Sequence, residues 1–147
     1  MADDEILQAK KKAMSLLLHN DRTEWELTDR LVRAGFSEQA VNDAIEYVRG
    51  FHYIDDKRYA ERFAQIYHSR RSIQRIKQDL NKRHVPDEYI EMAISEIEGG
   101  DSEALQKEIE KLTHGRADFS YEEKLKIVAK LYRKGFRLDD IRRFLDL

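Results

Sequence analysis

The chain contains no cysteine, one proline and only six glycines among its 147 residues. The absence of cysteine excludes disulfide bonds, thiolate nucleophiles and cysteine-bound metals. Because glycine and proline mark hairpins and loops, their scarcity favours helices joined by compact turns. No apolar run approaches the roughly 18 residues that cross a membrane, and the opening MADDEILQAKKK lacks the apolar core of a signal peptide. We therefore expect a cytoplasmic protein without a membrane segment.

Sequence motifs for catalysis are also absent. The five histidines are scattered and form no His-Glu-x-x-His pair for a metal. The pairs Asp55-Asp56 and Asp139-Asp140 are neighbours in sequence, so their side chains leave a helix in different directions and form no acid–base pair. No Gly-rich phosphate loop, Gly-x-Ser-x-Gly elbow or calcium loop is present. We predict a protein that is not an enzyme, has no catalytic residues and uses no cofactor or metal.

Charge, by contrast, is abundant and unevenly distributed. Charged residues make up 38% of the chain and hydrophobic residues 41%, which is typical of amphipathic helices with wide polar faces. The net charge is only −2, yet residues 57–84 contain nine Lys or Arg against two acids, and residues 95–123 contain nine acids against three basic residues. A basic middle beside an acidic segment can attract an acidic partner, or the two segments can neutralise each other.

One phrase occurs three times along the chain. RLVRAGFSEQAV at residues 30–41 and KLYRKGFRLDDI at 130–141 share Leu, Arg and Gly-Phe, and DLNKRHVPDEYI at 79–90 keeps the apolar spacing. Five apolar positions agree across the three copies, namely Leu27, Ile76 and Ile127; Leu31, Leu80 and Leu131; Phe36, Val85 and Phe136; Val41, Ile90 and Ile141; and Ile45, Ile94 and Leu145. A period near 50 residues predicts a repeat architecture.

Start and stop signals divide each repeat into three helices. Apolar residues four positions apart indicate a helix on both sides of the Gly-Phe pair. Gly35 suits the left-handed residue that follows a helix, and Phe36 then contacts Leu31 as in a Schellman motif. The pair Gly135-Phe136 repeats this device. Capping residues precede the second helix of each repeat, namely Thr23, Ser72 and Ser120.

These signals predict an all-α fold of about nine helices, arranged as an elongated, curved array of three tandem three-helix repeats. The predicted repeats span residues 1–52, 53–100 and 101–147, and the middle repeat is the basic one. Because a three-helix unit this small cannot bury all its apolar faces alone, we expect neighbouring repeats to stack into this array.

The stretch RRSIQRIKQDLNKR at residues 70–83 is the clearest candidate for a binding surface. Its buried stripe comprises Ile73, Ile76 and Leu80, and its polar stripe comprises Arg71, Arg75, Gln78 and Lys82. Such a polar stripe is either a solvated face paired internally, with Glu61, Asp79 or the acidic third repeat, or a docking surface for an anionic partner. The predicted partner-binding residues are Arg58, Arg62, Arg70, Arg71, Arg75, Lys77, Lys82 and Arg83.

A second group of residues is interpreted as structural. It comprises Gly35, Phe36, Asp55, Asp56, Tyr59, Gly135 and Phe136. The two aspartates lie near an expected helix start, where a carboxylate favourably meets the helix dipole. The single tryptophan, Trp25, and the other aromatic residues are interpreted as packing residues in the core or at turns.

Four phrases follow one another in a characteristic order: DRTEWELTDRLVRAGF from residue 21, YIDDKRYAERFAQ from 53, RIKQDLNKRHV from 75 and LYRKGFRLDDIRRFL from 131. With this order and spacing the chain resembles the RecX family of recombination regulators, essentially from end to end. It departs from the family pattern where His84 replaces a usual glycine, and where residues 69–72 lack another. At the first place we expect Pro86 to compensate by pushing Val85 into an extended conformation.

The resemblance implies a non-enzymatic negative regulator of the RecA recombinase. Members of the family are long, curved helical proteins that lie in the groove of the RecA–DNA filament and inhibit ATP turnover, strand exchange and coprotease activity. It therefore implies the RecA filament as the partner, with the basic middle repeat as the contact surface. Weak direct binding to DNA is a further interaction that we consider, and we expect a monomer.

Two other functions stay open on the sequence alone. The helix pairs around Gly35 and Gly135 could act as helix-turn-helix modules on DNA. However, the expected second helix at residues 38–47 carries Glu38, Asp43 and Glu46, which phosphates repel. An inert helical scaffold is the remaining function if the basic stripe is paired internally.

Overall fold

The structure is a computed structural model that describes residues 2–146. Within these residues it contains nine α-helices and no strand, as the sequence predicts. The helices are α1 (Ala2–His19), α2 (Glu24–Arg33), α3 (Glu38–Gly50), α4 (Asp56–Tyr67), α5 (Ile73–Lys82), α6 (Asp87–Ser95), α7 (Ser102–Thr113), α8 (Tyr121–Arg133) and α9 (Leu138–Leu145). The first and last residues of the predicted repeats, 1 and 147, lie outside the described part.

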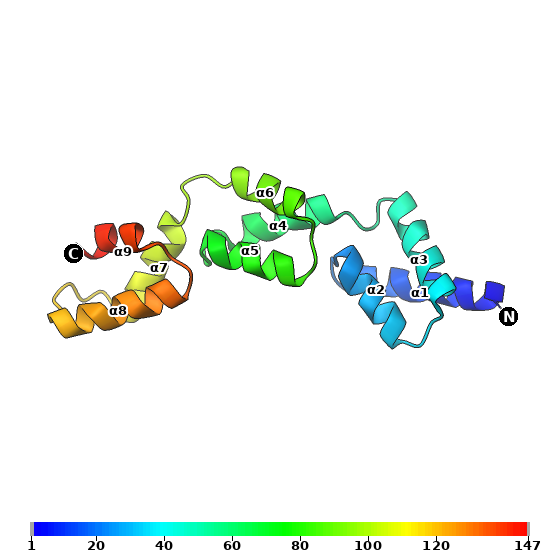
Figure 1. The fold of residues 1–147 in the computed structure, drawn as a ribbon, viewed down its shortest axis with the longest axis horizontal. Coiled ribbons are helices and arrows are strands. Elements are labelled where there is room, and N and C mark those ends of the chain that lie inside the picture. Colours follow the sequence, from blue (N-terminus) through cyan, green and yellow to red (C-terminus); the bar gives the residue numbers. More distant parts are fainter. Residues whose placement is uncertain (1, 147) are drawn as a thin grey trace.

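The nine helices form three units that follow one another in a curved row (Figure 1). Unit 1 comprises α1–α3, unit 2 comprises α4–α6 and unit 3 comprises α7–α9. The helix pairs that pack most extensively, such as α1 with α3, α4 with α6 and α8 with α9, belong to the same unit. This arrangement confirms the predicted elongated array of three-helix repeats.

Each unit closes an apolar core of its own. The cores are built around Leu27 and Leu31 in unit 1, Ile76 and Leu80 in unit 2, and Leu105 and Leu131 in unit 3, all of which are completely buried. The three clusters of buried residues are separate from one another. The units stack in a row as expected, yet each closes its own core, and alanines on α1 and α4 let the helices within a unit approach closely.

The second helix of each unit ends in the same Schellman motif. After α2, Gly35 has φ +93°, its N–H donates to the Val32 carbonyl, and the Phe36 N–H donates to the Leu31 carbonyl at 3.4 Å. After α8, Gly135 has φ +97° and the Phe136 N–H donates to Leu131 in the same way. These are the glycine turns that the sequence predicts.

The middle copy keeps this turn without a glycine. His84 itself adopts the left-handed conformation with φ +57°, and the Val85 N–H donates to the Leu80 carbonyl at 3.2 Å. A histidine thus takes the left-handed position that glycine holds in the other two copies. A non-glycine residue in this region costs roughly 1–2 kcal/mol, so other contacts of His84 must offset the strain.

Two hydrogen bonds join unit 1 to unit 2, at what we call the first junction. The Thr23 hydroxyl donates to the carbonyl of Arg83, which ends α5, at 2.9 Å. The N–H of Glu24 donates to the carboxylate of Asp56 at 2.9 Å. Asp56 was expected to lie near a helix start; it does, but its carboxylate serves α2, while Asp55 caps α4 by accepting from the Arg58 N–H.

The second junction, between units 2 and 3, repeats both bonds at equivalent positions. The Ser72 hydroxyl donates to the carbonyl of Lys134, which ends α8, at 2.9 Å. The N–H of Ile73 donates to the carboxylate of Asp101 at 2.7 Å. Both capping hydroxyls, on Thr23 and Ser72, are buried. We call this pair of hydrogen bonds the latch, because it joins the start of the second helix of one unit to the next unit.

Candidate partner-binding surface

Three arginines of unit 2 converge on the buried residue Asp79 of α5, two of them on its carboxylate. Arg71 contacts one carboxylate oxygen at 2.7 Å and Arg75 the other at 3.0 Å. Arg83 donates to the backbone carbonyl of the same residue at 2.8 Å. The Asp79 side chain is only 7% exposed, whereas those of Arg71 and Arg75 are 34% and 53% exposed. The carboxylate therefore positions the guanidinium groups while they remain accessible.

Aromatic rings of α4 support the same arginines. The rings of Tyr59, Phe63 and Tyr67 follow one another along the helix, with centroid distances of 6.1 and 4.6 Å. The guanidinium of Arg71 lies 3.9 Å from the Tyr67 ring, and that of Arg83 lies 5.0 Å from the Phe63 ring. Stacking on an aromatic face and pairing with a carboxylate both restrict arginine rotamers, so these side chains are held in place before any partner arrives.

A small pocket at the second junction joins these arginines to unit 3. It has a volume of about 190 Å³ and is lined by Arg70, Arg71, Ser72, Arg75, Glu108, Lys134 and Phe136. Lys134 pairs with Glu108 at 2.6 Å. Arg70 forms no ion pair within residues 2–146. Lys134 is about 60 residues from the arginines in sequence, and only the tertiary structure brings it close to them.

The other predicted binding residues lie elsewhere on unit 2. Arg62 pairs with Asp21 of unit 1 at 2.9 Å, and Lys77 pairs with Glu91 of α6 at 3.4 Å. Arg58 approaches the His52 carbonyl at 3.5 Å. Lys82 is exposed and forms no ion pair within the described residues. The eight predicted residues thus do not form one cluster, and several of them are paired internally, as the solvated-face interpretation expects.

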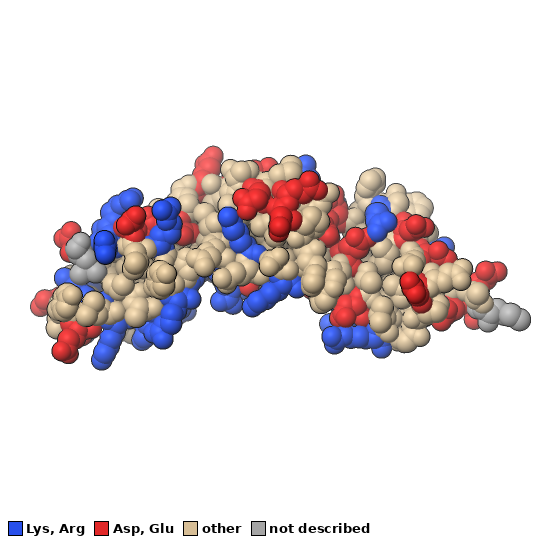
Figure 2. Space-filling view, in the orientation of Figure 1, with Lys and Arg blue, Asp and Glu red and all other residues tan. Residues whose placement is uncertain are grey.

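Basic side chains are nevertheless concentrated on one side of the molecule. Figure 1 shows α2, α5 and α8 along the concave side of the row, and Figure 2 shows Lys and Arg gathered there, while Asp and Glu cover the opposite side of unit 2. The last turns of these three helices carry Arg30, Arg33, Lys82, Lys130 and Arg133. We call this concave side of α2, α5 and α8 the basic edge. The sequence predicts a basic surface in the middle repeat only, because the net charge along the chain is highest there and the relative placement of the three second helices is not visible in it.

Trp25 is the residue whose predicted role changes most. It is 43% exposed and stacks on the His84 ring across the first junction, with a centroid distance of 4.2 Å. Trp25 is therefore a packing residue at a turn, that of the next unit, and does not belong to the core of its own unit. Its helical spacing resembles that of a core residue, but α2 directs it toward the next unit instead of its own.

Comparison with known families agrees with the division into three units. Residues 9–47 match the model described as "RecX, first three-helix domain", residues 55–94 the second such domain and residues 100–145 the third. The chain belongs to the RecX family. Within residues 2–146, none of its helices combines the length and the apolar character needed to cross a membrane.

Individual relatives support this membership. The chain is 33% identical over 149 residues to the regulatory protein RecX of Caldanaerobacter subterraneus subsp. tengcongensis, and covers 72% of it. It is 30% identical over 136 residues to RecX of Vibrio parahaemolyticus, and covers 88% of it. The crystal structure of RecX from Lactobacillus salivarius superposes with a TM-score of 0.80 at 27% identity, over 98% of both chains. RecX proteins are named as regulatory proteins, and the chain accordingly belongs to a regulatory family.

Proposed function

We propose that this chain is a negative regulator of a RecA-type recombinase. It lies in the groove of the RecA–DNA filament and thereby inhibits ATP turnover, strand exchange and coprotease activity. Membership in the RecX family supports the assignment to recombinase regulation. The observation that carries the docking mode is the basic edge, which follows the concave side of an elongated body.

The shape and charge of the molecule suit a long, curved anionic surface better than a compact one. A row of three units spreads its basic side chains over a large distance, so each contributes modestly and the total depends on simultaneous contact. Within unit 2, Asp79 and the α4 rings hold Arg71 and Arg75 in fixed positions, which lowers the entropy lost when they meet an anionic group.

The helix-turn-helix alternative has little support from the charges. The third helices α3 and α9 would be the recognition helices, yet α3 contains Glu38, Asp43 and Glu46, and both helices carry acidic residues in their first turn. Phosphates repel such surfaces. In its last turn α9 carries the basic pair Arg142 and Arg143, whereas α3 carries Arg49 alone.

The direct test is titration of the protein into RecA-coated single-stranded DNA while ATP hydrolysis and co-sedimentation are followed. We expect inhibition of hydrolysis together with co-sedimentation. No inhibition and no co-sedimentation would contradict the proposal. Strong, salt-dependent binding to naked DNA, with no preference for the filament, would instead support the DNA-binding alternative.

The basic edge is tested separately by charge reversal at a residue that does not support the fold. Lys82→Glu changes an exposed side chain in the last turn of α5 and is expected to weaken filament binding about threefold or more at low salt. The matched control is Lys111→Glu in the last turn of α7, which makes the same change of charge away from the edge. Equal loss in both variants would show that net charge, and not the edge, determines binding.

A further inference from the structure

One half of the latch is unmatched at each end of the described row. At both junctions, the hydroxyl that caps a second helix donates to the carbonyl that ends the second helix of the next unit. The equivalent hydroxyl of unit 3 is that of Ser120, which caps α8 and accepts from the Glu123 N–H. Within residues 2–146 it donates to no carbonyl. Ser120 is exposed, whereas Thr23 and Ser72 are buried.

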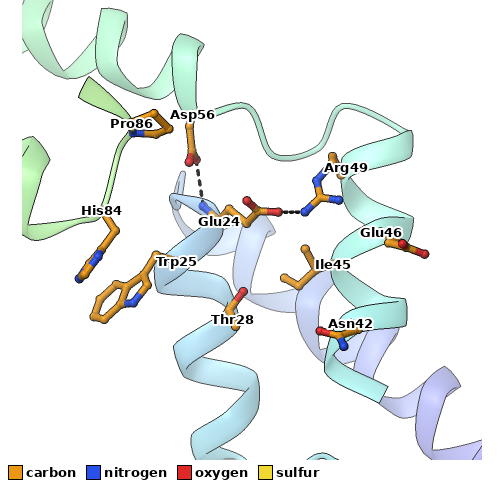
Figure 3. A pocket seen from close by; sticks show the side chains of 10 residues that line it. All are labelled: Glu24, Trp25, Thr28, Asn42, Ile45, Glu46, Arg49, Asp56, His84 and Pro86. Carbon is orange, nitrogen blue, oxygen red and sulfur yellow. Dashed lines mark hydrogen bonds and ion pairs between the residues drawn. The ribbon is translucent and has the colours of Figure 1, made fainter. Parts of the chain in front are cut away.

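Figure 3 shows how the second bond of the latch forms at the first junction. The carboxylate of Asp56 accepts from the N–H of Glu24, the first residue of α2. The carboxylate of Asp101 accepts from the Ile73 N–H in the same way. The first residue of α8 is Tyr121, whose N–H donates to no carboxylate within the described residues and whose side chain is 72% exposed. The start of α8 therefore has both donors of a latch available.

Unit 1 carries the matching carbonyl at the other end of the row. Ala34 ends α2, as Arg83 ends α5 and Lys134 ends α8. It is exposed, and its carbonyl accepts no hydrogen bond within residues 2–146. Phe36, after the turn, is only partly buried, whereas its counterparts in units 2 and 3 are 3% and 2% exposed. The end of α2 thus offers an acceptor and a half-covered turn to a unit that docks there.

Unit 1 also carries the carboxylate of a latch. Helices α1 and α4 each bury a pair of alanines at the same spacing, namely Ala9 and Ala13, and Ala60 and Ala64. When the helices are aligned on these pairs, Glu5 of α1 holds the position of Asp56. The Glu5 carboxylate accepts from the N–H of Ser37 at 3.3 Å and from its hydroxyl at 2.6 Å. Because a carboxylate has about four lone-pair sites, it can accept a further N–H.

The same alignment matches an ion pair that crosses the first junction. Arg62 of α4 pairs at 2.9 Å with Asp21, which precedes the cap of α2 by two residues. Lys11 of α1 holds the position of Arg62, and Asp118 precedes the cap of α8 by two residues. Lys11 and Asp118 are exposed, and neither forms an ion pair within residues 2–146. The two ends of the row thus carry opposite charges at matching places.

The form of the first junction leaves room for the start of α1. This helix begins three residues before Glu5, whereas α4 begins at Asp56 itself. Beside Asp56, the first junction has an open cleft of about 540 Å³ between α2, α3 and the turn after α5 (Figure 3). The corresponding space at an added junction would accommodate the additional turn of α1.

We propose that copies of this chain dock head to tail, with unit 3 of one copy on unit 1 of the next, through a third latch. The Ser120 hydroxyl donates to the Ala34 carbonyl of the next copy. The Tyr121 N–H donates to the Glu5 carboxylate of that copy. The contact uses different surfaces on the two copies, so it repeats and extends the row.

A single latch is a weak contact. An exposed ion pair between Asp118 and Lys11 adds little to its hydrogen bonds, and association must offset the lost translational and rotational freedom. We expect a dissociation constant on the order of 1 mM, so dilute protein is a monomer. The contact does not depend on the proposed function. If copies lie in one filament groove, as the proposed function has it, their effective concentration is much higher.

Carbodiimide cross-linking tests the contact in the unmodified chain, because it joins a lysine to a carboxylate only where the two touch. The protein is treated at about 1 mM, and the products are separated on a denaturing gel and digested for mass spectrometry. We expect covalent dimers and larger species that contain a Lys11–Asp118 link. These residues belong to units 1 and 3, at opposite ends of the row, so the link joins two copies (Figure 1). The Lys134–Glu108 pair, at 2.6 Å, is the internal positive control.

Charge reversal tests the same contact without a cross-linker. Asp118→Lys brings like charges together and should weaken self-association about threefold or more in sedimentation equilibrium. Adding Lys11→Asp restores opposite charges and should recover the wild-type dissociation constant. Glu98→Lys, in the exposed turn between α6 and α7, makes the same change of net charge and should have no effect. Unchanged far-ultraviolet circular dichroism shows that the variants are folded.

Three results would overturn the contact: no larger species at about 1 mM, larger species without the Lys11–Asp118 link, or no recovery in the double variant. Neither recombinase nor DNA is present, so this failure is distinct from failure of the proposed function. If filament inhibition persists while copies do not associate, only the head-to-tail contact is wrong. If copies associate but the filament is not inhibited, only the proposed function is wrong.

Discussion

The two junctions of the molecule share the latch but differ in the residue that faces it. At the first junction the left-handed residue of the turn is His84, whose ring stacks on Trp25. At the second junction it is Gly135, and a Cβ atom there would lie 2.5 Å from the hydroxyl oxygen of Ser72 and 3.3 Å from the Cβ of Gln74. The same backbone turn thus carries the imidazole ring of His84 at the first junction but leaves no room for a side chain at Gly135 in the second.

The second residue of the helix on the other side of each junction also differs. Trp25 follows the capping residue Thr23 by two positions, and Gln74 follows Ser72 by two. At the first junction the stacked rings accompany a cleft of about 540 Å³, whereas the second junction leaves a pocket of about 190 Å³. The latch therefore joins any two successive units, while the side chains around it decide how closely they approach.

The largest effect is expected from Gly135→Ala. The new Cβ meets Ser72, and the residue is held at a positive φ, so the free energy of unfolding should fall by about 2–4 kcal/mol. The matched control is Gly35→Ala, where φ is also positive but no atom lies within 4 Å of the new Cβ. Its cost should be only about 1–2 kcal/mol. Urea denaturation compares the two, and equal losses would contradict the close approach at the second junction.

The next effect concerns the latch itself. Thr23→Ala and Ser72→Ala each remove a helix cap and leave a carbonyl of the next unit without its donor, so each should cost about 2 kcal/mol. Ser120→Ala removes the N-cap of α8, at the end of this helix that takes part in no junction within one chain, and should cost about 1 kcal/mol. The difference in denaturation midpoint between Ser120→Ala and each of the other two variants measures how much the hydrogen bonds between units stabilise the protein. If all three variants lose the same stability, the bonds between units contribute nothing.

A smaller effect is expected at His84. His84→Ala removes the stack on Trp25 but keeps a strained φ, so it should destabilise the protein by about 1 kcal/mol. His84→Gly loses the same stack and also relieves the strain, so its stability should stay within about 0.5 kcal/mol of the wild type. Trp25 fluorescence should shift in both variants. Equal destabilisation by alanine and glycine would mean that the turn is not strained.

The smallest effect concerns pH at the two latches. Burial raises the pKa of both Asp56 and Asp101, so the folded protein binds protons at higher pH than the unfolded chain does. Their contribution to stability is present below the ordinary aspartate pKa and is lost as the pH rises through the folded pKa. Wild-type protein should therefore gain stability relative to Asp56→Asn as the pH falls from about 7 to about 4.5, by less than about 0.5 kcal/mol after solvent screening.

Asparagine keeps an oxygen that accepts from the Glu24 N–H, which makes Asp56→Asn a mild substitution. The same comparison for Asp101→Asn tests the second junction, where the Ile73 N–H is the donor. A relative loss of wild-type stability at acidic pH would mean that the hydrogen bond outweighs burial, contrary to the expected direction of the shift.

Local sequence rules were sufficient for much of the architecture. Three kinds of signal carried the prediction: apolar residues that recur at a period near 50, the capping residues Thr23, Ser72 and Ser120, and the glycines after α2 and α8. The caps and the glycines act over one or two turns of a helix. Together these signals predicted helical units, the array and the Schellman turns. The same rules identified Trp25 as a packing residue in the core or at a turn, but a helical stripe does not reveal whether a ring faces its own unit or the next one.

The candidate surface was only partly predictable. Charge along the sequence drew attention to the arginines of unit 2, but it could not distinguish Arg71, clamped by Asp79, from Lys82, which has no such partner within the described residues. Nor could it show that α2, α5 and α8 lie on the same side, because that depends on how successive units are rotated. The ion pairs and the rotation of successive units both depend on contacts that the order of charges along the sequence does not show.

The sequence by itself determined the three helical units, their turns and the excess of basic residues in the middle, since each depends on neighbours within a few residues. Only the tertiary structure decided which carbonyl accepts a hydrogen bond from each capping hydroxyl and that the ring of His84 stacks on Trp25. It also decided which basic side chains lie on the concave side. The physical reason is that the latch bonds join groups about 30 to 60 residues apart. Their geometry exists only once two complete units have formed and docked.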